Sequence, residues 1–294
     1  MPELPEVETI ARKLRPELVG KSITKANLLW YRTLATPTPT KFKREIVGQE
    51  IKAVGRRAKY VHIHLSKYHL FVHLRMSGDL YIKEEKTIPE KHDRLIFTLT
   101  PTPLRLPPFS SKMGGEKEGG GEAPGAREIS LVFNDTRKFG RVWLVRDPDE
   151  VIGGLGPEPL SDEFTPQILY DDLQSHHRQL KPLLLDQTFL AGMGNIYTDE
   201  ALHMARLHPL AVSNSVNREQ AQALWEAIRA VLQEGIRRNG ASIDWVYRGG
   251  EFQNYFRVYD RKGQPCPVCG TAIERLVVGQ RGTHVCPNCQ MIRS

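Results

Sequence analysis

The sequence predicts an α+β protein of several domains: an antiparallel β-sandwich with a leading α-helix, a helical middle domain and a C-terminal cysteine-rich hairpin. Three observations predict this order. Alternating, β-branched segments fill the first half of the 294-residue chain, helical periodicity begins near Thr165, and all four cysteines lie in the last 29 residues. We place the domain boundaries at 1–155, 156–255 and 256–294.

The chain opens with MPELPEVETIARKL, in which prolines and glutamates crowd the first residues. One interpretation is that Pro5 occupies the first position of a helix, whose positive end favours the neighbouring acids. Apolar residues then recur at helical spacing to about Leu18, which predicts one helix with a buried face. The other interpretation is that Pro2, once Met1 is removed, offers a free secondary amine as a reagent. This stretch alone leaves both open.

Six segments that follow are predicted as strands of a sandwich or barrel, because they alternate and are rich in β-branched residues. They are SITKANLLW, EIKAVGRRAKYVHIHL, HLFVHLRM, RLIFTLT, EISLVF and GRVWLV. Residues 101–127 interrupt them with 5 prolines and 6 glycines. That composition predicts a mobile loop, for which an excursion without function is the simpler interpretation.

The pattern changes to helical periodicity from about Thr165. The helical segments are PQILYDDLQSHH, QLKPLLLDQ, NIYTDEALHMARL and NREQAQALWEAIRAVLQEGIRRNG, and Asn239-Gly240 gives a stop signal. An aromatic, glycine-bearing segment, IDWVYRGGEFQNYF, then leads into the cysteine-rich end.

The cysteines form two CxxC pairs: Cys266 with Cys269 and, after 16 intervening residues, Cys286 with Cys289. Two tight turns at this spacing can donate four thiolates to one tetrahedral zinc ion. A redox pair would not explain the second CxxC, and two disulfides are disfavoured in the cytosol. Four thiolates leave no open position on the metal, so we predict a structural zinc ion whose binding contributes on the order of 10 kcal/mol to folding.

The positive charge is concentrated near the start. Residues 1–75 hold 15 Lys and Arg against 6 Asp and Glu, whereas the rest hold 26 against 28, so the net charge of +7 originates in the first quarter. Such a surface favours a polyanion, most simply nucleic acid, although scattered solvated lysines are the alternative. No apolar run is long enough to span a membrane, and a secretory signal is not evident, so we expect a cytoplasmic protein.

Ten motifs follow one another along nearly the whole chain outside residues 101–127. They are PELPEVET, GRRAKY, HLRMSG, KHDRL, DTRKFGR, GPEPL, KPLLLDQ, GMGNIYTDE, YDRKGQPCPVCG and QRGTHVCPNCQ. In this order they resemble the formamidopyrimidine-DNA glycosylases, which remove oxidised purines in base-excision repair. The opening motif is less similar to the sister enzyme endonuclease VIII, which prefers oxidised pyrimidines. The resemblance implies a helix-two-turn-helix middle domain, a zinc finger and a monomer that binds duplex DNA.

The resemblance assigns Pro2 as the nucleophile, and its chemistry is suited to that role. At pH 7 a lysine amine is less than roughly 0.1% neutral, whereas an α-amine is roughly 10% neutral. A proline Schiff base is a permanently cationic iminium, which favours elimination of the 3′ and then the 5′ phosphate. Glu3 can donate a proton to the ring oxygen as the sugar opens.

The resemblance also implies three groups near the lesion phosphates. Lys59 matches the proton donor for β-elimination, and Arg281 matches the zinc-finger arginine assigned to δ-elimination. Asn195 matches a phosphate-binding amide. The alternatives are a surface lysine, a solvated hairpin arginine and a helix N-cap.

Three residues match the wedge that enters the base stack when a nucleotide is extruded: Met76, Arg137 and Phe139. Taken alone, Met76 and Phe139 are more often core residues. Further DNA-contacting positions are matched by His92 and Lys181, with His73 as a possible addition. Which of His176, His177 or Arg178 touches phosphate is left open, and Glu6 is assigned only to the helix N-terminus.

We therefore predict a bifunctional DNA glycosylase and apurinic/apyrimidinic (AP) lyase that holds one structural zinc ion and acts on duplex DNA containing oxidised purines. An endonuclease VIII-type enzyme would share the chemistry but have a different pocket. A non-enzymatic zinc-ribbon DNA-binding protein would share the basic surface and the zinc, but would not need Pro2 beside Glu3. A zinc hydrolase is excluded because four cysteines occupy the metal. A lesion-pocket loop is expected within residues 240–256.

Overall fold

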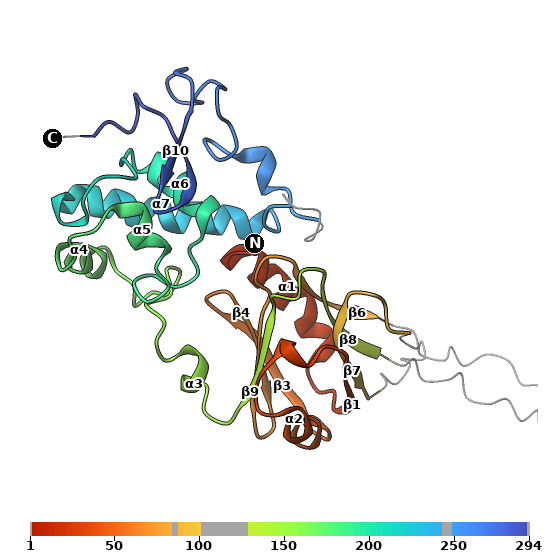
Figure 1. Cartoon of the computed structure of the whole chain (residues 1–294). Coiled ribbons are helices and arrows are strands. Elements are labelled where there is room, and N and C mark those ends of the chain that lie inside the picture. Colours follow the sequence, from red (N-terminus) through yellow and green to blue (C-terminus); the bar gives the residue numbers. More distant parts are fainter. Residues whose placement is uncertain (1, 84–87, 101–128, 243–248, 293–294) are drawn as a thin grey trace, which may run out of the picture.

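The computed structural model describes residues 2–83, 88–100, 129–242 and 249–292. The predicted loop at 101–127 lies outside these residues, as does part of the expected lesion-pocket loop. Among the described helices, none is long and apolar enough to cross a lipid bilayer. The chain forms a β-rich N-terminal part, a helical part and a small hairpin module (Figure 1).

The N-terminal part is a sandwich of two sheets preceded by α1 (Leu4–Leu18). One sheet has the order β1-β7-β8-β6 and the other β2-β9-β5-β4-β3. Their strands are β1 Ile23–Leu28, β2 Leu34–Thr36, β3 Ile51–Arg57, β4 Tyr60–Leu65, β5 His69–His73, β6 Gly78–Lys83, β7 Asp93–Leu99, β8 Ile129–Asp135 and β9 Arg141–Val145. The predicted antiparallel sandwich with a leading helix is confirmed, with one parallel pair, β2 with β9.

The sheets enclose an apolar core because alternate residues of each strand face inward. On β4, for example, Val61, Ile63 and Leu65 are fully buried, while the residues between them point outward. Two short helices were not predicted, α3 (Asp149–Ile152) and α2 (Pro39–Ile46). α2 closes one end of the sandwich by burying Phe42 and Ile46. It is only eight residues long, too short for a clear periodic signal in the sequence.

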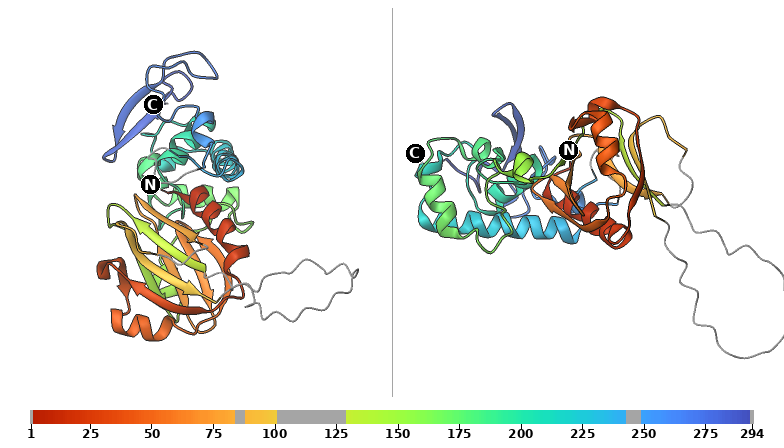
Figure 2. Two further views of the ribbon diagram at one scale, coloured as in Figure 1. Left: turned by 90° about the vertical axis from the view of Figure 1, so that its right-hand side faces the viewer. Right: turned by 90° about the horizontal axis from the view of Figure 1, so that it is seen from below.

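The helical part consists of α4 (Pro166–Gln174), α5 (Leu180–Leu185), α6 (Asn195–Met204) and α7 (Arg218–Arg237) around a second apolar core. The short α3 (Asp149–Ile152) lies on the connection from β9 (Figure 1). α1 packs against both β3 and α7, and Leu4 belongs to the second core. The N-terminus therefore lies where the sandwich meets the helical part, as both views of Figure 2 show.

The C-terminal module is the antiparallel hairpin of β10 (Glu274–Val278) and β11 (Arg281–Val285), flanked by the two cysteine pairs. Its small apolar core includes Val258 and Ile273. The predicted zinc-finger hairpin is confirmed, while the domain boundaries at 155/156 and 255/256 stay a prediction.

Candidate active site

The first turn of α1 meets the N-terminal end of α6. The Glu3 carboxylate is 2% exposed and accepts hydrogen bonds from the backbone N–H groups of Ile196 (3.1 Å) and Tyr197 (3.4 Å). A helix N-terminus offers unpaired N–H groups and a positive dipole end, so it suits an acidic side chain. Gly194 permits this approach, since a Cβ there would lie 2.1 Å from Glu3 Cδ.

A second buried carboxylate, that of Glu6, fixes the position of Glu3. Glu6 Oε2 accepts from the Glu3 backbone N–H (2.8 Å), and Glu6 Oε1 accepts from the Tyr197 hydroxyl and the Ala241 N–H, both at 2.7 Å. The last contact needs Gly240, whose φ is +79° and whose added Cβ would lie 2.6 Å from Glu6 Oε1. The sequence assigned Glu6 only to the helix N-terminus, but it also joins α1 to the helical part.

Lys59 supplies a buried positive charge that acts on Glu3. It follows β3 and is 6% exposed. Burial lowers the pKa of Lys59; the negative charge of Glu3 opposes this shift, and the positive charge of Arg281 adds to it. Burial likewise raises the pKa of Glu3 to about 7, with Lys59 lowering it and Glu6 raising it. Glu3 is thus substantially protonated near neutral pH, as a proton donor must be.

Glu158, from the GPEPL motif, holds the turn that carries Lys59. Its carboxylate accepts hydrogen bonds from the Arg56 guanidinium at 2.7 Å, the Arg57 guanidinium at 2.9 Å and the Ala58 backbone N–H at 2.5 Å. Burial raises the pKa of Glu158, but Arg56 and these hydrogen bonds outweigh it and hold the pKa below its usual value. Glu158 is therefore ionised and positions the turn.

The hairpin reaches the same region through β11. Arg281 is exposed, and the next carbonyl, that of Gly282, accepts from Asn195 Nδ2 (3.1 Å) and Lys181 Nζ (3.0 Å). Lys181 is fully buried and pairs with Asp199 at 2.6 Å. Because Lys181 is fully buried, it is not accessible to a phosphate in this structure, where it joins α5, α6 and the hairpin. Its DNA contact stays a prediction.

The three wedge candidates lie on neighbouring turns of the sandwich. Met76 is 41% and Phe139 50% exposed, and the Arg137 guanidinium lies 5.5 Å from the Phe139 ring centroid. The two turns are joined because Ser77 Oγ donates to Asp135, at 2.5 Å, and accepts from the Arg137 N–H, at 3.1 Å. Met76 and Phe139 therefore do not belong to the core.

The two histidine candidates have different environments. His73 is buried, and its Nδ1 accepts from the Arg75 N–H (3.0 Å), which leaves the proton on Nε2. Burial, with Arg75 and Lys59, lowers the pKa of His73 to about 3, so it can donate to a phosphate only as a neutral imidazole. His92 is half-buried, with its Nδ1 3.3 Å from Arg94.

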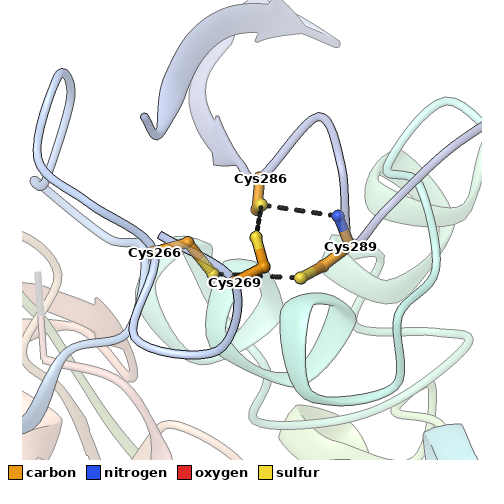
Figure 3. A group of neighbouring side chains, drawn as sticks. All are labelled: Cys266, Cys269, Cys286 and Cys289. Carbon is orange, nitrogen blue, oxygen red and sulfur yellow. Dashed lines mark hydrogen bonds between the residues drawn. The ribbon is translucent and has the colours of Figure 1, made fainter. Parts of the chain in front are cut away.

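The four cysteines converge as their spacing predicts (Figure 3). Their sulfurs lie within 4.8 Å of one another, with Cys269 and Cys286 at 3.4 Å and Cys266 and Cys289 at 3.9 Å. Four thiolates about 2.3 Å from a tetrahedral zinc ion lie roughly 3.8 Å apart, so these residues fit the metal. The cysteines are free thiols, and together they support one structural zinc ion.

Three family models match the chain in the order of its parts. They are the N-terminal domain of formamidopyrimidine-DNA glycosylase over residues 1–142, the H2TH domain of that enzyme over 155–246, and the zinc finger found in FPG and IleRS over 263–291. The fold and the site therefore define a zinc-finger DNA glycosylase.

Full-length relatives narrow this class. The formamidopyrimidine-DNA glycosylase of Chloroflexus aurantiacus is 43% identical over 99% of this chain and 98% of its own, and that of Protochlamydia amoebophila is 41% identical over 99% of each. The solved structures of Lactococcus lactis Fpg bound to DNA with an AP site, and of MutM bound to DNA with carbocyclic 8-oxo-G, are each 32% identical, with a TM-score of 0.83 over 99% of this chain and 100% of theirs. The chain belongs to the formamidopyrimidine-DNA glycosylase family.

Several positioning residues were not identified from the sequence: Tyr197, Asp199, Glu158, Ser77 and Asp135. A signal for the first two exists, because the helix segment NIYTDE places polar residues on every face and so requires some of them to be buried and paired. The others contact residues far away in the chain and carry no local signal.

Proposed function

We propose that this protein excises oxidised purines from duplex DNA and then cleaves the strand through a Schiff base at Pro2. The observation that carries this proposal is the buried Glu3 carboxyl beside Pro2, with a pKa raised to about 7 and Lys59 acting on it. Related structures support the substrate class: MutM is bound to 8-oxo-G DNA, and the Lactococcus lactis enzyme to Fapy-dG DNA.

The first step is attack by the Pro2 nitrogen on C1′ of the damaged nucleotide, which requires removal of Met1. The C1′–base bond breaks, and the base leaves with the bonding electrons and takes up the proton that the Pro2 nitrogen loses. Protonated Glu3 donates to the ring oxygen O4′, so that the sugar opens while the nitrogen lone pair forms the iminium. The resulting Glu3 carboxylate is stabilised by the N-terminus of α6 and by Lys59.

The iminium then withdraws electrons from the sugar. Loss of a C2′ proton forms the enamine, and the 3′ phosphate leaves with the electron pair; a second elimination releases the 5′ phosphate and leaves a one-nucleotide gap. Lys59, with its lowered pKa, is suited to donate a proton in the first elimination. Arg281, exposed on the hairpin, serves the second by binding the departing phosphate.

Phosphate binding and base extrusion use the remaining groups. Asn195 and the hairpin lie next to the acid, and His73 offers its Nε2–H from the sandwich. Met76, Arg137 and Phe139, all exposed, fill the space left in the stack by the extruded nucleotide, which offsets an unstacking cost of a few kcal/mol. We expect the protein to act as a monomer.

Base release from matched duplexes tests this function. We expect faster release of 8-oxoguanine than of an oxidised pyrimidine placed in the same sequence. Faster release of the pyrimidine would favour an endonuclease VIII-type enzyme. Tight binding without release of either base would indicate a DNA-binding protein that is not an enzyme.

A further inference from the structure

The outward face of the five-stranded sheet carries three histidines that the proposed chemistry does not use. His62 and His64 alternate with core residues along β4, so both side chains point away from the core. His69 lies on β5, directly opposite His64 in the strand register. β4 and β5 therefore bring three imidazoles together on one face of a rigid sheet.

Two of these rings are already in direct contact through their nitrogens. His62 Nε2 lies 2.9 Å from His69 Nδ1. The His62 ring stacks on buried Phe71, with centroids 4.3 Å apart and planes at 13°. The His69 ring stacks on His64, with centroids 4.7 Å apart and planes at 7°. Packing on either side thus keeps the two nitrogens facing each other.

In their neutral form, the His62 and His69 rings have nitrogen lone pairs that can bind a metal ion. Burial, together with His69 and His64, lowers the pKa of His62 to about 4, and burial and His64 also lower the pKa of His69. Both rings are neutral at neutral pH, and a single proton then joins the two facing nitrogens. When the ring that carries this proton moves it to its other nitrogen, both facing nitrogens have lone pairs and can act as ligands to one cation. The Asp147 carboxylate adds a nearby negative charge that acts on His69.

We propose that His62, His64 and His69 bind a divalent first-row transition ion at a site separate from the four cysteines. Two nitrogens about 2.0–2.1 Å from one ion lie about 2.9 Å apart at a right angle, but roughly 3.4 Å apart at a tetrahedral angle. The observed 2.9 Å is the length of the present nitrogen–nitrogen hydrogen bond, so the two nitrogens are already close enough to share an ion, and imidazole ligands suit Ni²⁺ and Cu²⁺. The rings must turn so that both lone pairs converge, and exposed His64 must leave its stack to become the third ligand.

Titration of the zinc-loaded full chain with Ni²⁺ tests this site. Calorimetry should show one Ni²⁺ bound per chain, while a chromogenic indicator shows that the cysteine-bound zinc is not released. His62→Gln, His64→Gln and His69→Gln should each weaken binding by at least about tenfold, the lower bound for changes even outside the ligand shell. His177→Gln, which changes an exposed histidine of the helical part, is the control and should leave the affinity unchanged.

Three results would overturn the proposal. They are no Ni²⁺ binding at millimolar concentration, binding accompanied by equivalent zinc release, and unchanged affinity in any of the three folded variants. Melting curves followed by circular dichroism establish that each variant is folded. If His62→Gln disturbs the contact with Phe71 and fails to fold, His64→Gln and His69→Gln carry the test.

Discussion

Replacing Glu3 by Gln should change how stability depends on pH. An unfolded glutamate has a pKa of 4.5, whereas burial raises that of folded Glu3 to about 7. Below pH 4.5 Glu3 is protonated in both the folded and the unfolded state, so its raised pKa does not lower the free energy of unfolding. As the pH rises between the two values, the unfolded state loses its proton first, and the folded protein becomes progressively less stable until the pH passes the folded pKa.

The size of this loss follows from the two pKa values. For one group with this shift, the destabilisation is about 1 kcal/mol at about pH 5 and about 3 kcal/mol at about pH 8, a difference of about 2–3 kcal/mol. The glutamine of Glu3→Gln cannot ionise, so the variant does not undergo this loss. Between about pH 5 and about pH 8, the unfolding free energy of the variant relative to wild type should therefore rise by about 2–3 kcal/mol. A constant cost, from the amide placed against the N–H groups of Ile196 and Tyr197, cancels between the two pH values.

Urea unfolding of both proteins at the two pH values measures this difference. Glu17→Gln, an exposed change near the end of the same helix, is the matched control and should show no comparable shift. Glu3→Gln should also lose base release, because it cannot donate the proton to O4′. If the stability difference is the same at both pH values, Glu3 is not a buried acid with a raised pKa, and the proton-donor argument fails.

The remaining predictions concern zinc, phosphate and the wedge. Cys269→Ala, or chelation of the zinc, should unfold the hairpin and abolish DNA binding; tight binding of damaged duplex by the zinc-free protein would contradict this. Arg281→Ala should reduce the slope of log affinity against log salt by about one, whereas Asn195→Ala should weaken binding with little change in slope; equal slope changes would argue against separate roles. Met76→Ala and Phe139→Ala should slow base release with little change in melting temperature, whereas strand cleavage of a duplex that already has an abasic site should be less affected; a much lower melting temperature with normal activity per folded molecule would indicate that these residues belong to the core.

The parts of the site with a local signal could be predicted from the sequence. The CxxC spacing indicated the metal ligands directly, and periodicity indicated α1, α7 and most of the strands. α2 was missed because its buried face consists of two residues, Phe42 and Ile46, and tertiary packing decides such a short helix.

Contacts between distant residues could not be predicted in this way. Glu158 accepts a hydrogen bond from the Ala58 N–H, 100 residues away in the sequence, and the Tyr197 hydroxyl donates one to Glu6, 191 residues away. Lys181 shows the same limit, since a lysine in a family motif suggests an exposed phosphate contact, while its partner Asp199 is evident only in the folded chain. Whether such a side chain is buried, and which residue it pairs with, is decided by the tertiary fold and not by the local sequence.

Borohydride trapping on duplex DNA containing 8-oxoguanine tests the central proposal most directly. Reduction of the Schiff base should join protein and DNA covalently, and mass spectrometry of the digested complex should place the adduct on the nitrogen of Pro2 in a chain that lacks Met1. Lys59→Met should still be trapped, because Lys59 is proposed to move a proton and not to attack the sugar. An adduct on Lys59, or full lyase activity in a chain that retains Met1, would contradict the proposal.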